Sequence, residues 1–266
     1  MDYTNLSKKR LIPKLQLRTA SYNPNKMVLV VTKQFNEVIE IGDPVSQAKI
    51  FQAQAADELI FINIDRHKKD IKKLSGIINK VSEEIFMPIT VGGGIKTSDD
   101  FRELLSNGAD KISINTSAVI RPELITETSE KYGAQCVVVS IDFKKDEQGE
   151  YWVYINGGQE KTSYHPLDWA LKAEKLGAGE LLLCNISFDG MREGLDLEII
   201  KSISENSSIP VIASGGCGLA QHFADGFLKG KADAVAAGSF FAHRDQNFMQ
   251  TRSQIKNAGI NIRMHH

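Results

Sequence analysis

The chain has 266 residues, enough to bury a large core, and its 42% hydrophobic and 24% charged residues are ordinary for a soluble protein. Its 32 basic and 33 acidic side chains give a formal net charge of −1, so no overall field favours nucleic acid or membrane as a partner. No apolar stretch approaches the roughly 18 residues of a membrane span. The polar, lysine-containing start does not resemble a signal peptide. We therefore expect a cytoplasmic protein.

Short apolar runs alternate with segments of helical period along the whole chain, which is typical of parallel strand–helix units. Several runs are continuously apolar, as in 137–142, and this suits strands buried on both faces. Eight strands are predicted, and a lone (β/α)8 TIM barrel has roughly 250 residues. We predict one such α/β barrel over residues 1–266, with strands at Leu11–Leu17, Leu59–Ile64, Ile89–Val91, Lys111–Asn115, Cys136–Phe143, Leu181–Ile186, Val211–Ser214 and Ala234–Ala237.

Local signals mark helix ends and two interruptions. Asp43 before Pro44 is an expected helix start, and 98–100 open another helix that 107–108 close. The stretch 18–42 is too long for an ordinary connection and is predicted to be a mobile active-site loop. The stretch 144–158 has a polar tip and an alternating segment, which predict a hairpin inserted after the fifth strand.

An internal repeat relates the two halves of the chain. Residues 56–64 resemble 178–186 at an offset of 122, and 108–118 align with 230–240 at the same offset. Each half therefore supplies four strands, with boundaries near 1–132 and 133–266. The repeat predicts a two-fold pseudosymmetric barrel with two equivalent ligand sites on one face.

Glycine-rich turns follow the third strand of each half. Gly93 and Gly94 lie in the first, and Gly215 and Gly216 in the second. Glycine lets backbone N–H groups approach an anion, and barrels of this type often bind phosphate there. Either turn alone could be only a tight turn, but two at matching places favour a ligand with a phosphate at each end. The expected partners are Asn115–Thr116 in the first half and Gly238–Ser239 in the second.

Carboxylates at strand ends are the candidates for proton transfer and substrate binding. Asp142 ends an apolar strand, where desolvation would raise its pKa and suit it to acid/base catalysis, although it could instead cap the following loop. Asp189–Gly190 could bind substrate hydroxyls or merely form a turn. At the end of the first strand, the position equivalent to Asp142 is occupied by Gln16.

Four charged residues begin strands one, two, four and six: Arg10, Glu58, Lys111 and Glu180. Projected inward, they would form a ring of alternating charge at the amino-terminal end of the barrel. Buried charges must be paired, so such a ring indicates either a structural plug or a gate. Three cysteines, Cys136, Cys184 and Cys217, are far apart without metal spacing, and we expect no metal and no cofactor.

Ten stretches together resemble the HisF family, the cyclase subunits of imidazole glycerol phosphate synthase, over essentially the whole chain. They are 9–13, 42–45, 57–61, 90–95, 108–116, 137–142, 177–183, 189–190, 212–216 and 259–263. The resemblance implies a half-barrel duplication and a bis-phosphorylated aminoimidazole carboxamide nucleotide as substrate. It also implies that a HisH-type glutaminase docks at the bottom of the barrel and supplies ammonia, which closes the imidazole ring of imidazole glycerol phosphate in histidine biosynthesis.

The resemblance assigns roles to the candidate residues. It implies that Asp142 is catalytic and that the charged ring is the gate through which ammonia enters. One phosphate would be held by Gly94, Asn115 and Thr116, and the other by Gly216, Gly238 and Ser239.

Gln16 is a departure from the family pattern, because the second catalytic aspartate of the family falls at this position. An amide neither accepts nor releases a proton near neutral pH, so half of an acid/base pair is missing. The family's loop lysine also has no certain equivalent, and Lys33 is only a candidate. The alternative hypothesis is therefore a HisF-like paralogue that passes ammonia to a separate sugar amidotransferase for a surface polysaccharide.

Overall fold

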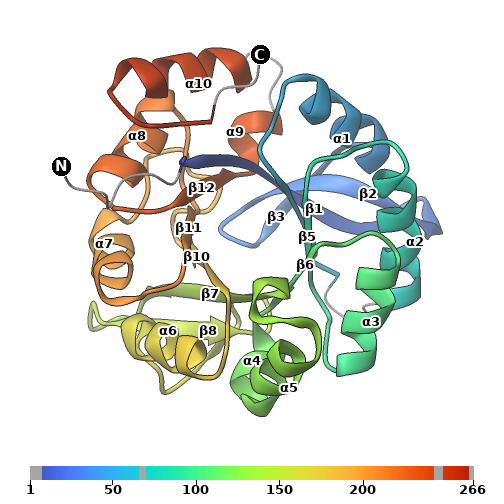
Figure 1. Ribbon diagram of the computed structural model, residues 1–266, viewed down its shortest axis with the longest axis horizontal. Helices are drawn as coiled ribbons and strands as arrows, with labels where there is room; N and C mark the ends of the chain where they lie inside the picture. Colours follow the sequence, from blue (N-terminus) through green and yellow to red (C-terminus); the bar gives the residue numbers. More distant parts are fainter. Residues whose placement is uncertain (1–7, 66–69, 243–247, 264–266) are drawn as a thin grey trace.

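The computed structural model describes residues 8–65, 70–242 and 248–263. Within these residues, eight parallel strands pair side by side, and pairing of the last with the first closes them into a barrel. Figure 1 shows the ring of strands with helices around it. In ring order the strands are β1 (Arg10–Ala20), β4 (Leu59–Asn63), β5 (Ile89–Gly92), β6 (Lys111–Ile114), β7 (Val137–Lys145), β10 (Glu180–Asn185), β11 (Val211–Ser214) and β12 (Ala234–Ala237).

The helices connect successive strands on the outside of the barrel (Figure 1). This arrangement confirms the predicted (β/α)8 fold. The helices are α1 (Pro44–Ala53), α2 (Ile71–Ser82), α3 (Ser98–Ser106), α4 (Thr116–Ile120), α5 (Glu123–Tyr132), α6 (Pro166–Lys175), α7 (Leu197–Asn206), α8 (Ala220–Leu228), α9 (Ser239–Ala242) and α10 (Phe248–Asn257), with a 3-10 turn at Ala134–Cys136.

Side-chain alternation along the strands divides the core into two parts. On β1, Leu11, Leu15 and Leu17 belong to the large apolar core that includes residues of the surrounding helices, while Ile12 belongs to a separate cluster of strand residues. Since successive strand residues point to opposite faces, this separate cluster fills the inside of the barrel. Its other fully or nearly buried members are Ile60, Val138, Leu182, Ile212, Ala234 and Ala236.

Two predicted helix starts are confirmed by their capping contacts. The Asp43 side chain accepts a hydrogen bond from the backbone N–H of Ser46, and Pro44 is the first helical residue of α1. Thr97 and Asp100 form a reciprocal capping box at the start of α3. Both helices begin directly after segments that contribute to one end of the barrel.

The prediction of a loop over 18–42 was wrong. Strand β1 continues to Ala20, and the chain then forms β2 (Asn23–Lys33) and β3 (Glu37–Gly42), which pair antiparallel to β1 and to each other. Val28 and Val30 are buried with Ala20 in a small apolar cluster of their own. Burial of this valine-rich run against β1 outweighs the length argument that favoured a loop.

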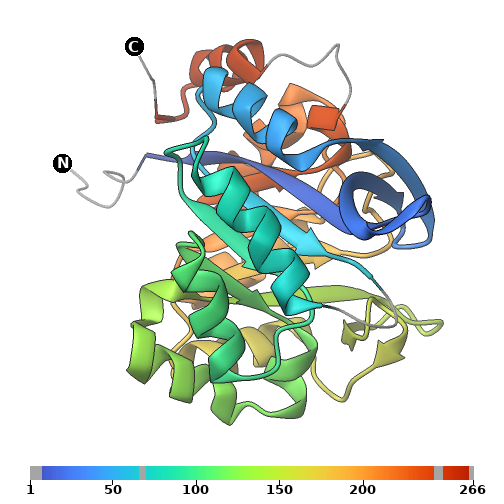
Figure 2. The ribbon, with the colours of Figure 1, turned by 90° about the vertical axis from the view of Figure 1, so that its right-hand side faces the viewer.

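The hairpin predicted after the fifth barrel strand is confirmed. Strand β8 (Tyr151–Ile155) pairs antiparallel to the end of β7, and β9 (Glu160–Lys161) extends the sheet by one short strand. Figure 2 shows this addition and the β2–β3 addition projecting from the same end of the barrel, where the parallel strands finish. Both therefore border the expected active-site face.

The two half-barrels, 1–132 and 133–266, remain a prediction from the internal repeat, and residues 1–7 and 264–266 lie outside the described part. None of the helices in the described ranges is both long enough and apolar enough to span a membrane.

Candidate active site

A cavity of about 1030 Å³ opens at the carboxyl ends of the barrel strands. It is lined by residues of β1, β2 and β7, by residues that follow β4, β5 and β6, and by the turn after β8. Among the predicted site residues, the cavity wall contains Gln16, Gly93, Gly94, Asn115, Thr116 and Asp142. Four strands or the loops after them, β1, β5, β6 and β7, thus bring these six residues to one space.

The first glycine turn is held tightly against the neighbouring strand. Gly93 has φ of +98°, and a Cβ atom added there would lie 2.1 Å from the backbone oxygen of Asn63. No other residue fits that position without moving the β4 backbone. Beside it, the Asn115 side-chain amide donates to the Ser140 carbonyl at 3.0 Å, and the Thr116 hydroxyl accepts from the Asn156 N–H at 3.0 Å. We call the Gly93–Gly94 turn together with Asn115 and Thr116 the first cradle. The contacts of Asn115 and Thr116 fix it to β7 and to the hairpin.

The second glycine turn lies beside a smaller pocket. Its lining includes all six residues predicted for the second half: Asp189, Gly190, Gly215, Gly216, Gly238 and Ser239. Gly216 has φ of +118°, and its Cβ position would be 1.9 Å from the Gly194 carbonyl oxygen, so the turn again requires glycine. We call the Gly215–Gly216 turn together with Gly238 and Ser239 the second cradle. Three residues line both this pocket and the large cavity, and therefore connect the two cradles: Lys14, Gln16 and Thr32.

Asp142 is half-buried in the wall of the large cavity. The Ser140 hydroxyl lies 3.4 Å from its Oδ1, and Cys184 is its partner in register on the adjacent strand. Cys184 also lines the large cavity, and its sulfur lies 4.0 Å from Asp189 Oδ1, so Cys184 connects the Asp142 side of the site with the Asp189 side. The position of Asp142 is suitable for proton exchange with a ligand that spans both cradles.

Gln16 is buried at the centre of the site, in contact with a residue of the unpredicted strand β2. The Thr32 hydroxyl lies 2.9 Å from the Gln16 side-chain oxygen and 3.0 Å from Asp189 Oδ2. A hydroxyl donates only one hydrogen, and an ionised carboxylate is the stronger acceptor. We therefore assign the Thr32 hydrogen to Asp189 and orient the Gln16 amide so that its NH2 group donates to Thr32.

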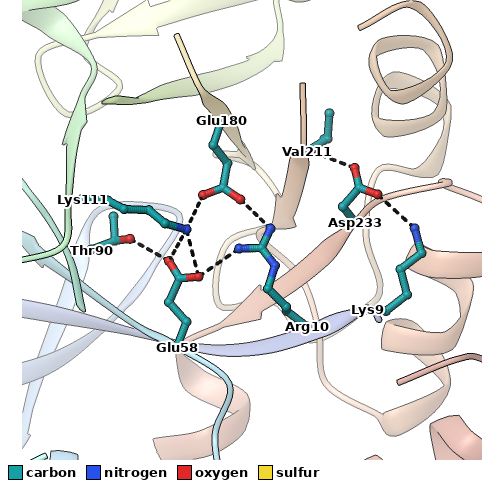
Figure 3. A network of polar contacts seen from close by, with 8 residues as sticks. All are labelled: Lys9, Arg10, Glu58, Thr90, Lys111, Glu180, Val211 and Asp233. Carbon is teal, nitrogen blue, oxygen red and sulfur yellow. Dashed lines mark hydrogen bonds and ion pairs between the residues drawn. The ribbon is translucent and has the colours of Figure 1, made fainter. Parts of the chain in front are cut away.

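The four charged residues at the other end of the barrel form one network (Figure 3). Lys111 Nζ is 3.1 Å from Glu58 and 2.9 Å from Glu180, and Arg10 pairs with the same two carboxylates. Thr90 adds a hydrogen bond of 2.7 Å to Glu58. Burial opposes the charge of Arg10, but Glu180 and Glu58 hold the pKa of Arg10 above its usual value. The ring of alternating charge expected from the sequence is present.

A second ion pair fixes the strands that carry this ring. Asp57, the neighbour of Glu58, accepts from the backbone N–H of Leu11 at 2.9 Å and pairs with the buried Arg252 of α10 at 3.0 Å. The starts of β1 and β4 are thus tied to each other and to the last helix. Directly above the ring lies the apolar cluster that contains Ile12, so polar groups occupy the two ends of the barrel and apolar groups its middle.

Among residues 8–65, 70–242 and 248–263, no group of three or more histidine, cysteine, aspartate or glutamate side chains is arranged so that it could hold a metal ion. The comparison with known proteins identifies the family of this chain.

The family model described as "Histidine biosynthesis protein" matches residues 13–246. A protein of Prochlorococcus marinus, provisionally named imidazole glycerol phosphate synthase subunit hisF2, is 48% identical over 258 residues, covering 97% of this chain and 98% of the relative.

Two further relatives carry the name imidazole glycerol phosphate synthase subunit HisF. That of Alkaliphilus metalliredigens is 42% identical, covering 96% of this chain and 98% of its own, and that of Bacillus licheniformis is 41% identical, covering 96% and 99%. The chain belongs to the HisF family. The resemblance seen in the sequence motifs is thereby confirmed across nearly the full length.

Within this HisF-family barrel, two central residues were not predicted as site residues. Lys14 lies on β1 two positions after Ile12, which faces the inside of the barrel. The alternation of strand side chains therefore predicts that Lys14 also points inward, and this could have revealed it. Thr32 could not have been found, because it lies in the stretch predicted as a loop. Lys33, the candidate for the family's loop lysine, is exposed at the end of β2 and lines neither pocket.

Proposed function

We propose that this chain is the cyclase subunit of an imidazole glycerol phosphate synthase. It binds a bis-phosphorylated aminoimidazole carboxamide nucleotide and combines it with ammonia to form imidazole glycerol phosphate, with release of an aminoimidazole carboxamide ribonucleotide. The observation that carries the proposal is the pair of glycine cradles that open on one face and meet at a shared centre beside Asp142. The full-length similarity to proteins named as HisF supports the same reaction.

Each part of the site has a task in this proposal. The two cradles bind one phosphate each through backbone N–H groups and through the side chains of Asn115, Thr116 and Ser239. Holding both ends fixes the reacting atoms of the nucleotide above the barrel axis, which lowers the entropic barrier. Asp142 then accepts and returns protons as the nitrogen and oxygen atoms change their bonds during ring closure.

Ammonia reaches this centre from the opposite end of the barrel. The relatives are named as subunits, which implies a partner, and we take that partner to be a HisH-type glutaminase docked over the charged ring. The ring acts as a gate, and the apolar layer above it admits neutral ammonia while excluding the ammonium ion, whose desolvation is costly. The cysteines Cys136, Cys184 and Cys217 are free thiols, in keeping with a cytoplasmic setting.

Replacing Lys111 tests the gate. Lys111→Met leaves Glu58 and Glu180 with Arg10 as their only cation of the ring, so the gate loses its alternating charge. We expect glutamine-dependent turnover to fall about tenfold or more, which corresponds to about 1.4 kcal/mol of barrier. Turnover with added ammonium salt should change little, because that ammonia does not come from the glutaminase. The ratio of the two rates is the measurement.

Lys9→Met is the matched control. Lys9 pairs with Asp233 at 3.1 Å at the same end of the barrel, but outside the four-residue ring (Figure 3). An equal loss of coupling in both variants, or equal loss of both activities in Lys111→Met, would show that the ring is a structural plug.

One observation favours a second candidate function. Because Gln16 is an amide, the chain could conduct ammonia to a separate sugar amidotransferase, for modification of a surface polysaccharide, without catalysing ring closure itself. The discriminating experiment supplies the purified chain with the nucleotide and ammonium salt, and measures both products by chromatography. Equal amounts of the two products support the cyclase. Absence of both products, also in Gln16→Asp, together with intact stimulation of the glutaminase, would favour the conduit.

A further inference from the structure

Lys14 is a buried charged residue that the reaction proposed above does not yet use. It lies on β1, and its side chain is only 8% exposed. Its Nζ donates to the Cys184 sulfur at 3.3 Å and lies 3.7 Å from Asp189 Oδ1. It also lines both the small pocket and the large cavity. The ammonium group therefore stands where the two cradles meet.

The charge of Lys14 is maintained by its surroundings. Burial alone would lower the pKa of Lys14, but the Cys184 sulfur and the carboxylates of Asp189 and Asp142 more than offset burial, and the pKa lies above the ordinary lysine value. Burial raises the pKa of Cys184 to about 12, so its sulfur is a neutral thiol at neutral pH. The carboxylates of Asp189 and Asp142 then supply the negative charge beside Lys14, and they favour its protonated form.

The hydrogen-bonding capacity of this cation is only partly used. An ammonium group has three N–H donors, a thiol sulfur is a weak acceptor, and 3.7 Å to Asp189 is too long for a hydrogen bond. Within the described part of the chain, Lys14 thus keeps donor capacity beside open space. Gln16, two residues further on the same strand, has its amide committed to Thr32 in the orientation assigned above.

We infer that Lys14 is a substrate-binding residue, whose ammonium holds an electron-rich oxygen atom of the ligand midway between its two phosphates. The inference rests on the proposed function, because it requires a ligand anchored in both cradles. In such a ligand the middle segment passes Lys14 on one wall and Asp142 on the other. The β1 wall then supplies positive charge to the ligand oxygen, and the β7 wall supplies the carboxylate that exchanges protons.

A simpler role would be neutralisation of Asp189 and Asp142 without ligand contact. The two roles differ in which ligand is affected by removal of the charge. An alkane bisphosphate of matched length carries both phosphates and no oxygen between them. The bis-phosphorylated nucleotide carries both phosphates and several oxygen atoms. Calorimetric titration of both ligands against Lys14→Met and the unaltered chain isolates the contact with the middle of the ligand.

We expect Lys14→Met to weaken nucleotide binding by roughly 10- to 100-fold more than alkane bisphosphate binding, the usual effect of losing a charged hydrogen bond. Lys14→Arg should keep part of the preference. Lys201→Met, which removes a surface lysine paired with Glu205 on α7, is the matched control and should bind both ligands as the unaltered chain does. If Lys14→Met does not fold, Lys14→Gln, whose amide can still donate to Asp189, provides the comparison.

Equal weakening of both ligands would mean that Lys14 acts on the phosphates by its charge alone, and unchanged affinity for both would mean a structural role. Either result overturns the inference and leaves the proposed function standing. If the unaltered chain binds the alkane bisphosphate but not the nucleotide, the proposed function fails together with the inference.

Discussion

Asp142→Asn is expected to lower ammonia-dependent turnover by at least about 100-fold, because a positioned acid or base typically contributes 10²- to 10⁴-fold. Asparagine has nearly the shape of aspartate but cannot accept a proton. Asp142 lines the cavity. Gln16 occupies the position where the resemblance places the family's other catalytic aspartate, so no carboxylate at that position can compensate for the loss. The measurement is steady-state kinetics with ammonium salt and the nucleotide.

The loss should fall on kcat, with the affinity for the nucleotide preserved, because the cradles are unaltered. Asp225→Asn is the control. It replaces an aspartate on the outer helix α8, where Asp225 pairs with Lys229 at 3.0 Å, and it should keep full activity. Activity of Asp142→Asn within about threefold of the unaltered chain would exclude proton transfer by this residue.

Gln16→Asp is expected to raise ammonia-dependent kcat by roughly 10²- to 10⁴-fold, as restoration of a missing acid/base group should. Two neighbouring groups can stabilise the new carboxylate. The Thr32 hydroxyl can turn its hydrogen from Asp189 to a carboxylate at this position, and Lys14 provides a positive charge nearby that reduces repulsion from Asp189 and Asp142.

Two matched variants separate charge from size at this position. Gln16→Asn has the length of aspartate without its charge and should give no gain. Gln16→Glu has the shape of glutamine with a charge, and should give a smaller gain because its carboxylate stands one methylene further out. Equal rates in Gln16→Asp and Gln16→Asn would show that this position takes no part in proton transfer.

The barrel strands were predictable because both of their faces are buried. Val211–Ser214 and Ala234–Ala237 agree with the predicted ranges residue for residue, and other barrel strands differ mainly at their ends. Such runs are short, apolar and bounded by turns, so burial and local pattern give the same answer. The charged ring was predictable for a related reason, since four charged residues at equivalent strand starts must meet inside a closed barrel.

The contacts of Lys14 are distant in sequence, whereas the unpredicted strands β2 and β3 pair with their neighbours in the chain as hairpins. Strand β1 continues beyond the barrel, and its free edge forms the backbone hydrogen bonds that hold β2, which in turn pairs with β3. The sequence pattern did not predict that β1 continues this far. Lys14 meets Cys184 and Asp189 only after the barrel has closed. Propensity and spacing describe neighbours in the chain, and they do not identify partners that closure brings together.

The most direct test of the account is a comparison of ligands with two, one and no phosphates on the same nucleotide. If the two glycine cradles act on one ligand, the bis-phosphorylated nucleotide should bind one per chain and at least about 100-fold more tightly than either mono-phosphorylated form, since the second phosphate binds as part of an anchored molecule. Equal affinity of the bis- and mono-phosphorylated forms, or two bis-phosphorylated molecules bound per chain, would contradict it.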